Sequence, residues 1–167
     1  MQLFIRTAGI DEIDVCFALL RESAEWLRDK GIDYVQYYIE PSEWLNEWIH
    51  DGFAKCEVKF VCNGDGEVIA TYRVVLPDCE NIEYQGIDTA YLYSFAVRRD
   101  MKGMGIGYEV MRMIEENMRE MNIKYMRFNC GANVPRLQKY YEDFGFTAVK
   151  PIMPGDEEYI VYEKRVM

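Results

Sequence analysis

The sequence is poor in histidine, in paired cysteines and in long apolar runs. Its one histidine, His50, argues against a zinc site or a histidine-based catalytic triad, and no metal is expected. The five cysteines are scattered and form no CxxC pair, which is typical of reduced residues in a cytoplasmic protein. No stretch approaches the roughly 18–20 consecutive apolar residues of a membrane-spanning helix, so we expect no membrane partner.

Positive charge is also scarce, because 19 lysines and arginines stand against 29 acidic residues and leave a formal net charge of −10. A nucleic-acid partner is therefore not expected, since neutralising a phosphate backbone needs a basic face. The acidity is compatible with a cationic substrate, although solubility alone is the other explanation. Any anionic ligand must be held by a local arrangement, because the long-range field of the chain opposes it.

The 167 residues fit one domain spanning 1–167, and no repeat, linker or low-complexity tract interrupts them. Alternating apolar residues predict a strand at 56–62, short apolar runs predict the other strands, and apolar residues at helical spacing predict the helices between them. The predicted strands are 3–6, 56–62, 68–76, 91–97, 124–130, 146–149 and 159–162, and the predicted helices are 11–30, 42–51, 106–121 and 135–144. This order indicates an α+β fold with a mixed α/β sheet.

Several residues predict where the helices begin and end. Asp11 suits the N-cap of the first helix, and Gly52 is expected to close the second. Pro135 suits the start of the last helix, and Gly145 suits the position just after its end. The helix that joins the strands at 91–97 and 124–130 predicts that these two run parallel through a right-handed crossover.

One run, Tyr91–Val110, carries most of the functional information. An apolar, aromatic strand leads into a basic turn, which is followed by Gly103, Gly105 and Gly107 and then by an amphipathic helix. A glycine-rich loop at a helix N-terminus holds phosphate, because its N–H groups point at the ligand and the helix adds partial positive charge. The run therefore predicts a phosphate-bearing ligand.

Two common phosphate-binding loops do not fit this spacing. A dinucleotide fold needs G-x-G-x-x-G, and here Tyr108 stands at the third glycine position. A P-loop needs G-x-x-x-x-G-K-[ST], which occurs nowhere in the chain. The ligands of these two loops are excluded on that basis.

The hexapeptide Lys102–Gly107 resembles the [QR]-x-x-G-x-[GA] acetyl-CoA signature of the GNAT superfamily of N-acetyltransferases, with lysine in place of glutamine or arginine. Further on, Asn133 and the run Tyr141–Phe146 resemble the second signature of that family, a helix carrying Y-x-x-x-G-F. In many members the asparagine stands seven residues before the tyrosine, whereas Asn133 stands eight before Tyr141. The order of elements matches the family over nearly the whole chain.

The resemblance implies a GNAT-like fold, with a central, mostly antiparallel sheet, a parallel and splayed pair of fourth and fifth strands, and about four flanking helices. It also implies acetyl-CoA as cosubstrate, its pyrophosphate held by loop N–H groups and by charge from Lys102 and either Arg98 or Arg99. The arm of the cofactor would pair with the backbone of the central strand. The residues expected to bind acetyl-CoA are Phe95, Ala96, Val97, Lys102, Gly103, Met104, Gly105, Ile106, Gly107, Tyr108 and Asn133.

The reaction implied is direct transfer of an acetyl group to an amine, which must first lose a proton. For an alkylamine at pH 7 this costs roughly 4–5 kcal/mol. The candidates for the general base are Glu83 and Asp88 in the acidic loop before the central strand, with Glu80, Tyr93 and Ser94 as further options. Tyr141 matches the usual general acid of the family, although packing in the core is its alternative role.

We therefore expect an acetyl-CoA-dependent N-acetyltransferase that acts on a small cationic or amino-acid-like amine. One alternative is a GNAT-fold module that binds CoA thioesters as a sensor without turnover, and another is a protein or peptide N-acetyltransferase. The aromatic segment from Tyr34 to Trp48 is either packing between helix and sheet or the wall of an acceptor pocket. Exposed aromatics and edge strands leave a homodimer open.

Overall fold

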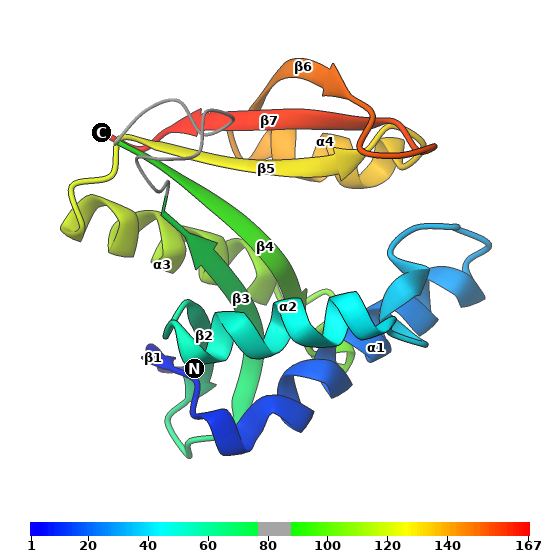
Figure 1. The fold of residues 1–167 in the computed structure, drawn as a ribbon. Helices are drawn as coiled ribbons and strands as arrows, with labels where there is room; N and C mark the ends of the chain where they lie inside the picture. Colours follow the sequence, from blue (N-terminus) through cyan, green and yellow to red (C-terminus); the bar gives the residue numbers. More distant parts are fainter. Residues whose placement is uncertain (77–87) are drawn as a thin grey trace. The chain divides into compact units, whose positions relative to one another are not determined.

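The computed structural model describes residues 1–76 and 88–167, which contain seven strands and four α-helices (Figure 1). The strands are β1 (Leu3–Thr7), β2 (Val58–Asn63), β3 (Val68–Val75), β4 (Thr89–Val97), β5 (Tyr125–Gly131), β6 (Thr147–Ile152) and β7 (Tyr159–Arg165). The helices are α1 (Ile13–Asp29), α2 (Glu43–Ala54), α3 (Ile106–Glu120) and α4 (Pro135–Asp143). The strand order β1-β2-β3-β4-β5-β7-β6 makes one mixed sheet, which confirms the predicted fold class.

The chain forms two compact units, and α3 and β4 contribute to both. The first unit comprises Met1–Val74 and Tyr93–Val110, and the second comprises Val75–Leu92 and Met111–Met167. That a single domain spans 1–167 stays a prediction.

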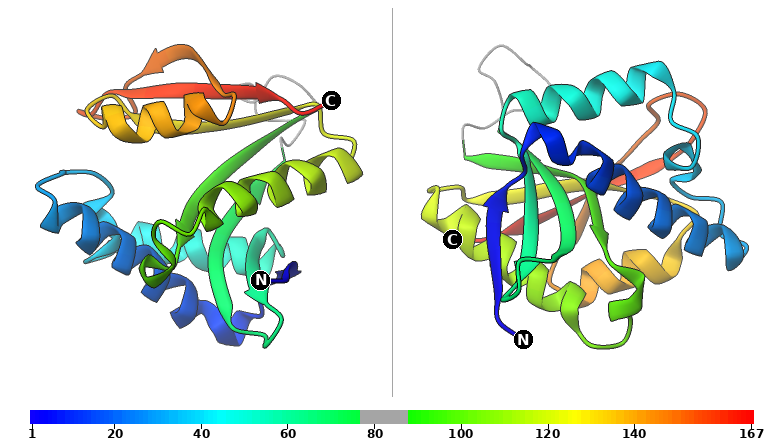
Figure 2. Two further views of the ribbon diagram at one scale, coloured as in Figure 1. Left: turned by 180° about the vertical axis from the view of Figure 1, so that it is seen from behind. Right: turned by 90° about the horizontal axis from the view of Figure 1, so that it is seen from below.

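In the first unit, α1 and α2 cover one side of the antiparallel strands β1, β2 and β3 (Figures 1 and 2). Their apolar residues repeat at helical spacing, so each helix presents one stripe to the sheet. The core that results is built from Cys16, Leu19, Leu20 and Ala24 of α1, Leu45, Ile49 and Phe53 of α2, and Val58, Phe60 and Cys62 of β2. Burying these side chains provides the main stabilisation of this unit.

The prediction that Asp11 caps the first α-helix is wrong, because a short 3₁₀ helix precedes α1. Asp11 lies inside a 3₁₀ helix, Ile10–Glu12, and α1 begins only at Ile13. The cause is Glu12, whose carboxylate accepts the Gly9 N–H at 2.9 Å and pairs with Arg6 at 2.6 Å. These contacts tighten the chain before the α-helix starts, and helical spacing alone does not reveal them.

Gly52 does not end the second helix, because α2 continues to Ala54. The residue is a glycine for a packing reason: a Cβ atom at Gly52 would lie 2.8 Å from Nε of Arg73. The strand that follows is also shorter than expected, since Cys56 lies in the turn after α2 with a φ of 58° and β2 begins at Val58. The helix start was predicted well, as Ser42 caps α2 by accepting the Leu45 N–H at 3.2 Å.

Replacing Glu12 by glutamine is expected to lower the free energy of unfolding by about 1 kcal/mol at pH 7. Arg6 and the Gly9 N–H lower the pKa of Glu12 from 4.5 to about 2. A depressed carboxylate pKa stabilises the fold above the ordinary value, and this contribution is lost as the pH falls from 4.5 towards 2. Urea unfolding of both proteins at pH 7 and pH 3 measures the difference, and an equal difference at the two pH values would contradict it.

In the second unit, β5 is the central strand. It runs parallel to β4, with Thr89 opposite Tyr125 and Tyr91 opposite Arg127, which confirms the predicted parallel pairing, while the right-handed crossover stays a prediction. Its other side pairs antiparallel with β7 along its whole length, and β7 pairs antiparallel with β6. The splay expected between β4 and β5 concerns the far ends of these strands, which belong to different units, and it stays a prediction.

The ends of α4 are as predicted. Pro135 is the first helical residue, where its missing N–H costs nothing. Gly145 follows the C-cap residue Phe144 with a φ of 100°, a left-handed conformation that glycine adopts without a steric penalty. These two signals are local, and local signals of this kind can be read from sequence.

Among residues 1–76 and 88–167, no helix is long and apolar enough to cross a membrane. In the same residues, no three histidine, cysteine, aspartate or glutamate side chains are grouped so that they could hold a metal ion.

Candidate active site

Strand β4 contains a left-handed residue, Ser94, whose φ is 51°. A non-glycine residue in this region costs about 1–2 kcal/mol, and such strain tends to be kept at functional sites. The consequence is visible in the side chains. The ring of Tyr93 packs edge-on against Trp48 of α2 at 5.3 Å, and the hydroxyl of Ser94 lies 3.0 Å from the hydroxyl of Tyr38. Two consecutive residues therefore face the segment 36–54, Ser94 towards Tyr38 and Tyr93 towards α2, where a regular strand would present only one.

The glycine loop follows β4 directly. A 3₁₀ helix, Arg99–Met101, leads to Gly103 and Gly105, whose φ values are 80° and 73°, and α3 begins at Ile106. A Cβ atom added to either glycine would meet no heavy atom within 4 Å, so the loop surface is open on these sides. The left-handed backbone at both positions explains why the sequence has glycine there.

Several N–H groups of the loop are left without an acceptor. Within the part of the chain that the structure describes, no bond is recorded from the N–H groups of Gly103, Gly105, Ile106 and Gly107. By contrast, Met104 donates to the Met101 carbonyl and Tyr108 donates to the Gly105 carbonyl. Unpaired N–H groups at the start of a helix carry partial positive charge and suit an anionic ligand. Four of the six N–H groups expected to surround pyrophosphate are thus available.

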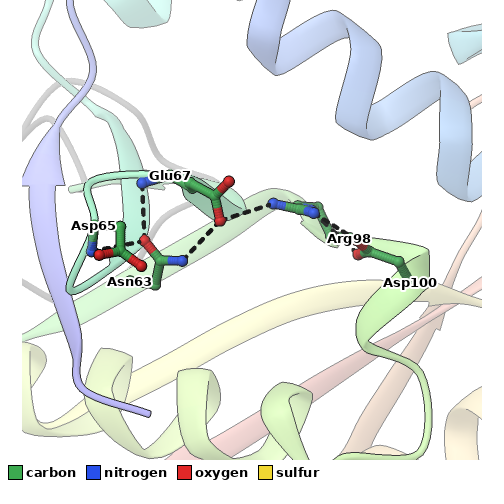
Figure 3. Close-up of polar contacts among 5 residues, drawn as sticks. All are labelled: Asn63, Asp65, Glu67, Arg98 and Asp100. Carbon is green, nitrogen blue, oxygen red and sulfur yellow. Dashed lines mark hydrogen bonds and ion pairs between the residues drawn. The ribbon is translucent and has the colours of Figure 1, made fainter.

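Three basic residues lie beside the glycine loop in sequence, and one of them, Arg98, is already paired with carboxylates. Arg98 is held by carboxylates: it donates to Asp100 at 3.1 Å, and its guanidinium lies 3.8 Å from Glu67 (Figure 3). The Asp100 carboxylate raises the pKa of Arg98. Glu67 also accepts a hydrogen bond from the Asn63 amide at 2.8 Å, so the β2–β3 turn is tied to the end of β4 (Figure 3). Arg98 therefore serves the scaffold, which leaves Arg99 and Lys102 as sources of charge.

Arg99 and Lys102 share one aromatic ring, that of Trp26 on α1. The guanidinium of Arg99 lies 3.8 Å from the ring centroid and the ammonium of Lys102 lies 5.1 Å from it. Partial burial lowers the pKa of Arg99, and its Nε atom has no hydrogen-bond partner among the described residues. Cation–π contacts of this kind hold both charges close to the glycine loop. The sequence analysis did not identify Trp26. Its position off the apolar stripe of α1 was the sequence feature that could have indicated a role other than core packing.

An aromatic surface continues from Tyr93 along α2. Trp48 contacts Tyr93, and Trp44 stacks on Trp48 with 6.4 Å between the ring centroids. Trp44 is 67% exposed, which is unusual for so large an apolar side chain. Behind the tryptophans, the guanidinium of the buried Arg73 lies 4.0 Å from the centroid of the Trp48 ring and pairs with Glu57 at 2.6 Å. Trp48 is thus fixed from one side, while Trp44 faces solvent.

Tyr141 lies on α4 in the second unit. Its ring packs against Phe128 of β5 at 4.2 Å, Tyr140 at 5.3 Å and Phe146 at 6.3 Å. Burial, with a smaller effect from Cys130, raises the pKa of Tyr141 well above its ordinary value. The phenol is therefore protonated at physiological pH, as a proton donor must be. The ring of Tyr141 also packs against other aromatic side chains, which was the alternative role expected for it from the sequence.

The remaining predicted residues are placed as follows. Asn133 is exposed in the turn before α4, and Asp88 pairs with Lys124 at 2.6 Å. Glu80 and Glu83 lie outside the described residues. The first unit brings together Phe95, Ala96, Val97 and the loop Lys102–Tyr108, whereas Asp88, Asn133 and Tyr141 belong to the second.

A mixed sheet with a left-handed residue in β4, followed by an open glycine loop at a helix N-terminus, is an arrangement that suits a protein with an anionic cofactor. The sequence model of the Acetyltransferase (GNAT) family matches residues 25–146. This match covers most of the chain, and the protein therefore belongs to the GNAT acetyltransferase family. It is an acetyl-CoA-dependent N-acetyltransferase, as the loop signature predicted.

Individual relatives agree with this assignment. The chain is 26% identical over 166 residues to YesJ, an uncharacterized N-acetyltransferase of Bacillus subtilis (strain 168), with 95% of this chain and 88% of YesJ covered. A GNAT-family acetyltransferase from Listeria monocytogenes superposes with a TM-score of 0.76 at 18% identity, covering 98% of this chain and 94% of the other. The PaiA N-acetyltransferase from Thermoplasma acidophilum, solved in complex with coenzyme A, gives a TM-score of 0.62 at 17% identity, with 99% of each chain covered.

Proposed function

We propose that the protein transfers the acetyl group of acetyl-CoA directly to the primary amine of a small cationic or amino-acid-like acceptor. The observation that carries this proposal is the open glycine loop with four unpaired N–H groups, at Gly103, Gly105, Ile106 and Gly107. These groups fit the pyrophosphate of the cofactor, which needs closely spaced donors in a chain whose net charge of −10 opposes anions. The relative that was solved with coenzyme A supports the same ligand.

The residues proposed to hold the cofactor are those that the loop signature implies. Lys102 and the loop N–H groups bind phosphate, and the backbone of Phe95 and Val97 pairs with the amide-bearing arm. Ala96, Met104, Tyr108 and Asn133 complete the proposed set. When bound, acetyl-CoA supplies the acetyl group as a thioester. The N–H of Phe95 or Ala96 is proposed to stabilise the negative charge that develops on the carbonyl oxygen, a contribution typically worth about 3–4 kcal/mol.

Proton movements complete the proposed reaction. The acceptor nitrogen loses a proton as it forms its bond to the acetyl carbon, and the bond from that carbon to sulfur breaks. Tyr141 donates its proton to the departing sulfur. Asp88 and Glu83 remain the proposed general bases, and Asp88 forms an ion pair with Lys124.

The aromatic surface formed by Tyr93, Trp48 and Trp44 supports the proposed acceptor class. Glu47 lies three residues after the exposed Trp44, on the same face of α2, and it is exposed as well. An exposed indole with a neighbouring carboxylate suits a cation, because the ring face and the negative charge attract it together. We therefore propose that this surface receives the positively charged part of the acceptor.

Two other functions make different predictions. A sensor module would bind acetyl-CoA without releasing free thiol in the presence of amines. A protein or peptide N-acetyltransferase would acetylate N-terminal peptides faster than small amines. A cytoplasmic location remains part of our proposal, in keeping with the absence of a disulfide bond among the four cysteines that the structure describes. The proposed function is compatible with either a monomer or a homodimer.

The proposal is tested first by thermal shift with acetyl-CoA, NADH and ATP. Acetyl-CoA at near-millimolar concentration should raise the Tm, because a ligand that binds only the folded state stabilises it. Equal shifts with all three ligands, or none with acetyl-CoA, would refute the cofactor site. Free-thiol release across a panel of small amines and peptides then separates the three functions.

Replacing Trp44 by alanine should raise the KM for a cationic amine about 10-fold and leave the KM for acetyl-CoA unchanged. The reason is the loss of a cation–π contact worth roughly 0.5–2 kcal/mol. Initial rates with varied amine provide the measurement. The control is Met153→Ala, because Met153 is similarly exposed, 65% against 67% for Trp44, and lies in the other unit. An unchanged KM for the amine would show that acceptors bind elsewhere.

A further inference from the structure

The hydroxyl pair between Tyr38 and Ser94 joins segments that are far apart in sequence. The two oxygen atoms lie 3.0 Å apart, which is within hydrogen-bond distance. Tyr38 belongs to the 3₁₀ helix Gln36–Tyr38 between α1 and α2, and Ser94 is the left-handed residue of β4. The contact thus ties the connection between the helices to the strand on which the cofactor arm is proposed to lie.

Tyr38 is itself rigidly held. Its side chain is 8% exposed and forms part of the core of the first unit. The short helix that carries it is anchored by Gln36, whose amide donates to the Ala24 carbonyl at 3.0 Å and to the Tyr34 carbonyl at 2.9 Å. Burial raises the pKa of Tyr38 well above its ordinary value, so the phenol is protonated at physiological pH. A fixed, neutral hydroxyl is suited to hold a partner in one geometry.

The geometry of Ser94 matters because of the peptide that follows it. Rotation about the backbone of Ser94 sets the direction of the next peptide unit, which carries the N–H of Phe95. The N–H of Phe95 is one of the two alternatives, with that of Ala96, proposed above to stabilise charge on the carbonyl oxygen during transfer. Such a donor contributes only when it is aimed before the reaction begins. A left-handed serine without support would relax towards an ordinary strand conformation, because that conformation is less strained.

We propose that Tyr38 is a positioning residue of this enzyme: its hydroxyl holds Ser94 in the left-handed conformation and thereby aims the Phe95 N–H at the reacting carbonyl. This inference rests on the proposed function, in that it assigns the strand to acetyl transfer. It adds a residue outside both signatures of the family, and it gives the connection between α1 and α2 a part in turnover. Tyr38 does not touch the reacting atoms and acts through Ser94.

The test is Tyr38→Phe, which deletes the hydroxyl and keeps the ring. We expect kcat with the best amine of the panel to fall about 10-fold, while the KM for acetyl-CoA changes less than twofold, because the glycine loop is untouched. Ser94→Ala should have the same effect, and the double variant should be no slower than either single one, since both remove the same hydrogen bond. An unchanged kcat, or effects that multiply in the double variant, would overturn the proposal.

The matched control is Tyr72→Phe. Tyr72 is also a buried tyrosine of the first unit, and its hydroxyl has no hydrogen-bond partner among the residues the structure describes. Its removal should leave kcat unchanged and the Tm equal or higher, because an unpaired buried hydroxyl destabilises the fold. A kcat loss of similar size in Tyr72→Phe and Tyr38→Phe would show a merely structural effect and overturn the positioning role.

A second measurement does not depend on turnover. Amide hydrogen exchange at Phe95 should be faster in Tyr38→Phe than in the wild type and unchanged in Tyr72→Phe, because only the first variant frees Ser94. Unaltered exchange at Phe95 in Tyr38→Phe would overturn the proposal even if no acceptor were known. Failure of the proposed function has a different signature: the wild type itself would show neither a thermal shift with acetyl-CoA nor thiol release.

Discussion

Replacing Gly105 by valine is expected to raise the Kd for acetyl-CoA about 100-fold. The φ of Gly105 is 73°, and a β-branched residue there costs about 1–2 kcal/mol or more, so the loop changes conformation to escape the strain. The change misaligns N–H groups that each contribute roughly 0.3–1 kcal/mol towards a charged ligand. A combined loss near 3 kcal/mol corresponds to about two orders of magnitude in affinity. Calorimetric titration of wild type and variant with acetyl-CoA measures it.

The chain offers a close control for this substitution. Gly31 follows α1 with a φ of 71°, and like Gly105 it has no heavy atom within 4 Å of an added Cβ. Gly31→Val therefore introduces the same backbone strain in the same unit and should lower the Tm by a similar amount. Its affinity for acetyl-CoA should equal that of the wild type. If both variants lose affinity equally, strain has spread through the unit and the loop is not the binding site.

The acidity of the chain makes this loop more important than its length suggests. With a net charge of −10, no general field draws a phosphate ligand in, and Arg98 is neutralised by Asp100 and Glu67. In the proposed site, binding relies instead on oriented N–H groups and on two nearby cations, Arg99 and Lys102, whose charges lie over the ring of Trp26. The same acidity favours a cationic acceptor. One chain can thus attract the amine through its overall charge and hold the cofactor through a local arrangement.

Much of the fold could be predicted because its signals are local. Pro135 and Gly145 mark the ends of α4 through backbone geometry, and the parallel pairing of β4 with β5 follows from chain connectivity. The predictions for Asp11 and Gly52 failed for the opposite reason. Glu12 pairs with Arg6 and shifts the helix start, and Arg73 packs against Gly52 from a strand more than twenty residues away. Contacts of this kind depend on the folded chain, and no spacing rule reveals them.

The candidate site likewise contains residues that the sequence predicts and residues that only the folded structure reveals. The glycine loop has a spacing that can be recognised, and its left-handed glycines explain that spacing physically. Ser94 carries no such mark, because serine rarely adopts a positive φ and nothing in its neighbours requires it. Tyr38 was one aromatic residue in a segment rich in them. The feature that singles it out is structural: its hydroxyl oxygen lies 3.0 Å from the hydroxyl oxygen of Ser94.

Replacing Tyr141 by phenylalanine is expected to lower kcat about 100-fold while the ring keeps its contacts with Phe128 and Phe146. General acids contribute roughly 10²–10⁴-fold, and the raised pKa of Tyr141 keeps its proton in place across the usual assay range. The Tm should change little, because the variant deletes one hydroxyl from an otherwise intact aromatic cluster. The measurement is the initial rate of thiol release at saturating acetyl-CoA and amine.

The decisive comparison for Tyr141 uses the leaving group. When the acetyl donor is a thioester of a more acidic thiol, its thiolate leaves without needing a proton, so the defect of Tyr141→Phe should shrink several-fold with such a donor if the phenol is the acid. A purely structural defect would be the same with both donors. Tyr140→Phe is the matched control, since Tyr140 is the adjacent tyrosine of α4 and its ring lies 5.3 Å from that of Tyr141. Normal turnover in Tyr140→Phe beside a donor-dependent loss in Tyr141→Phe would assign the proton to one hydroxyl.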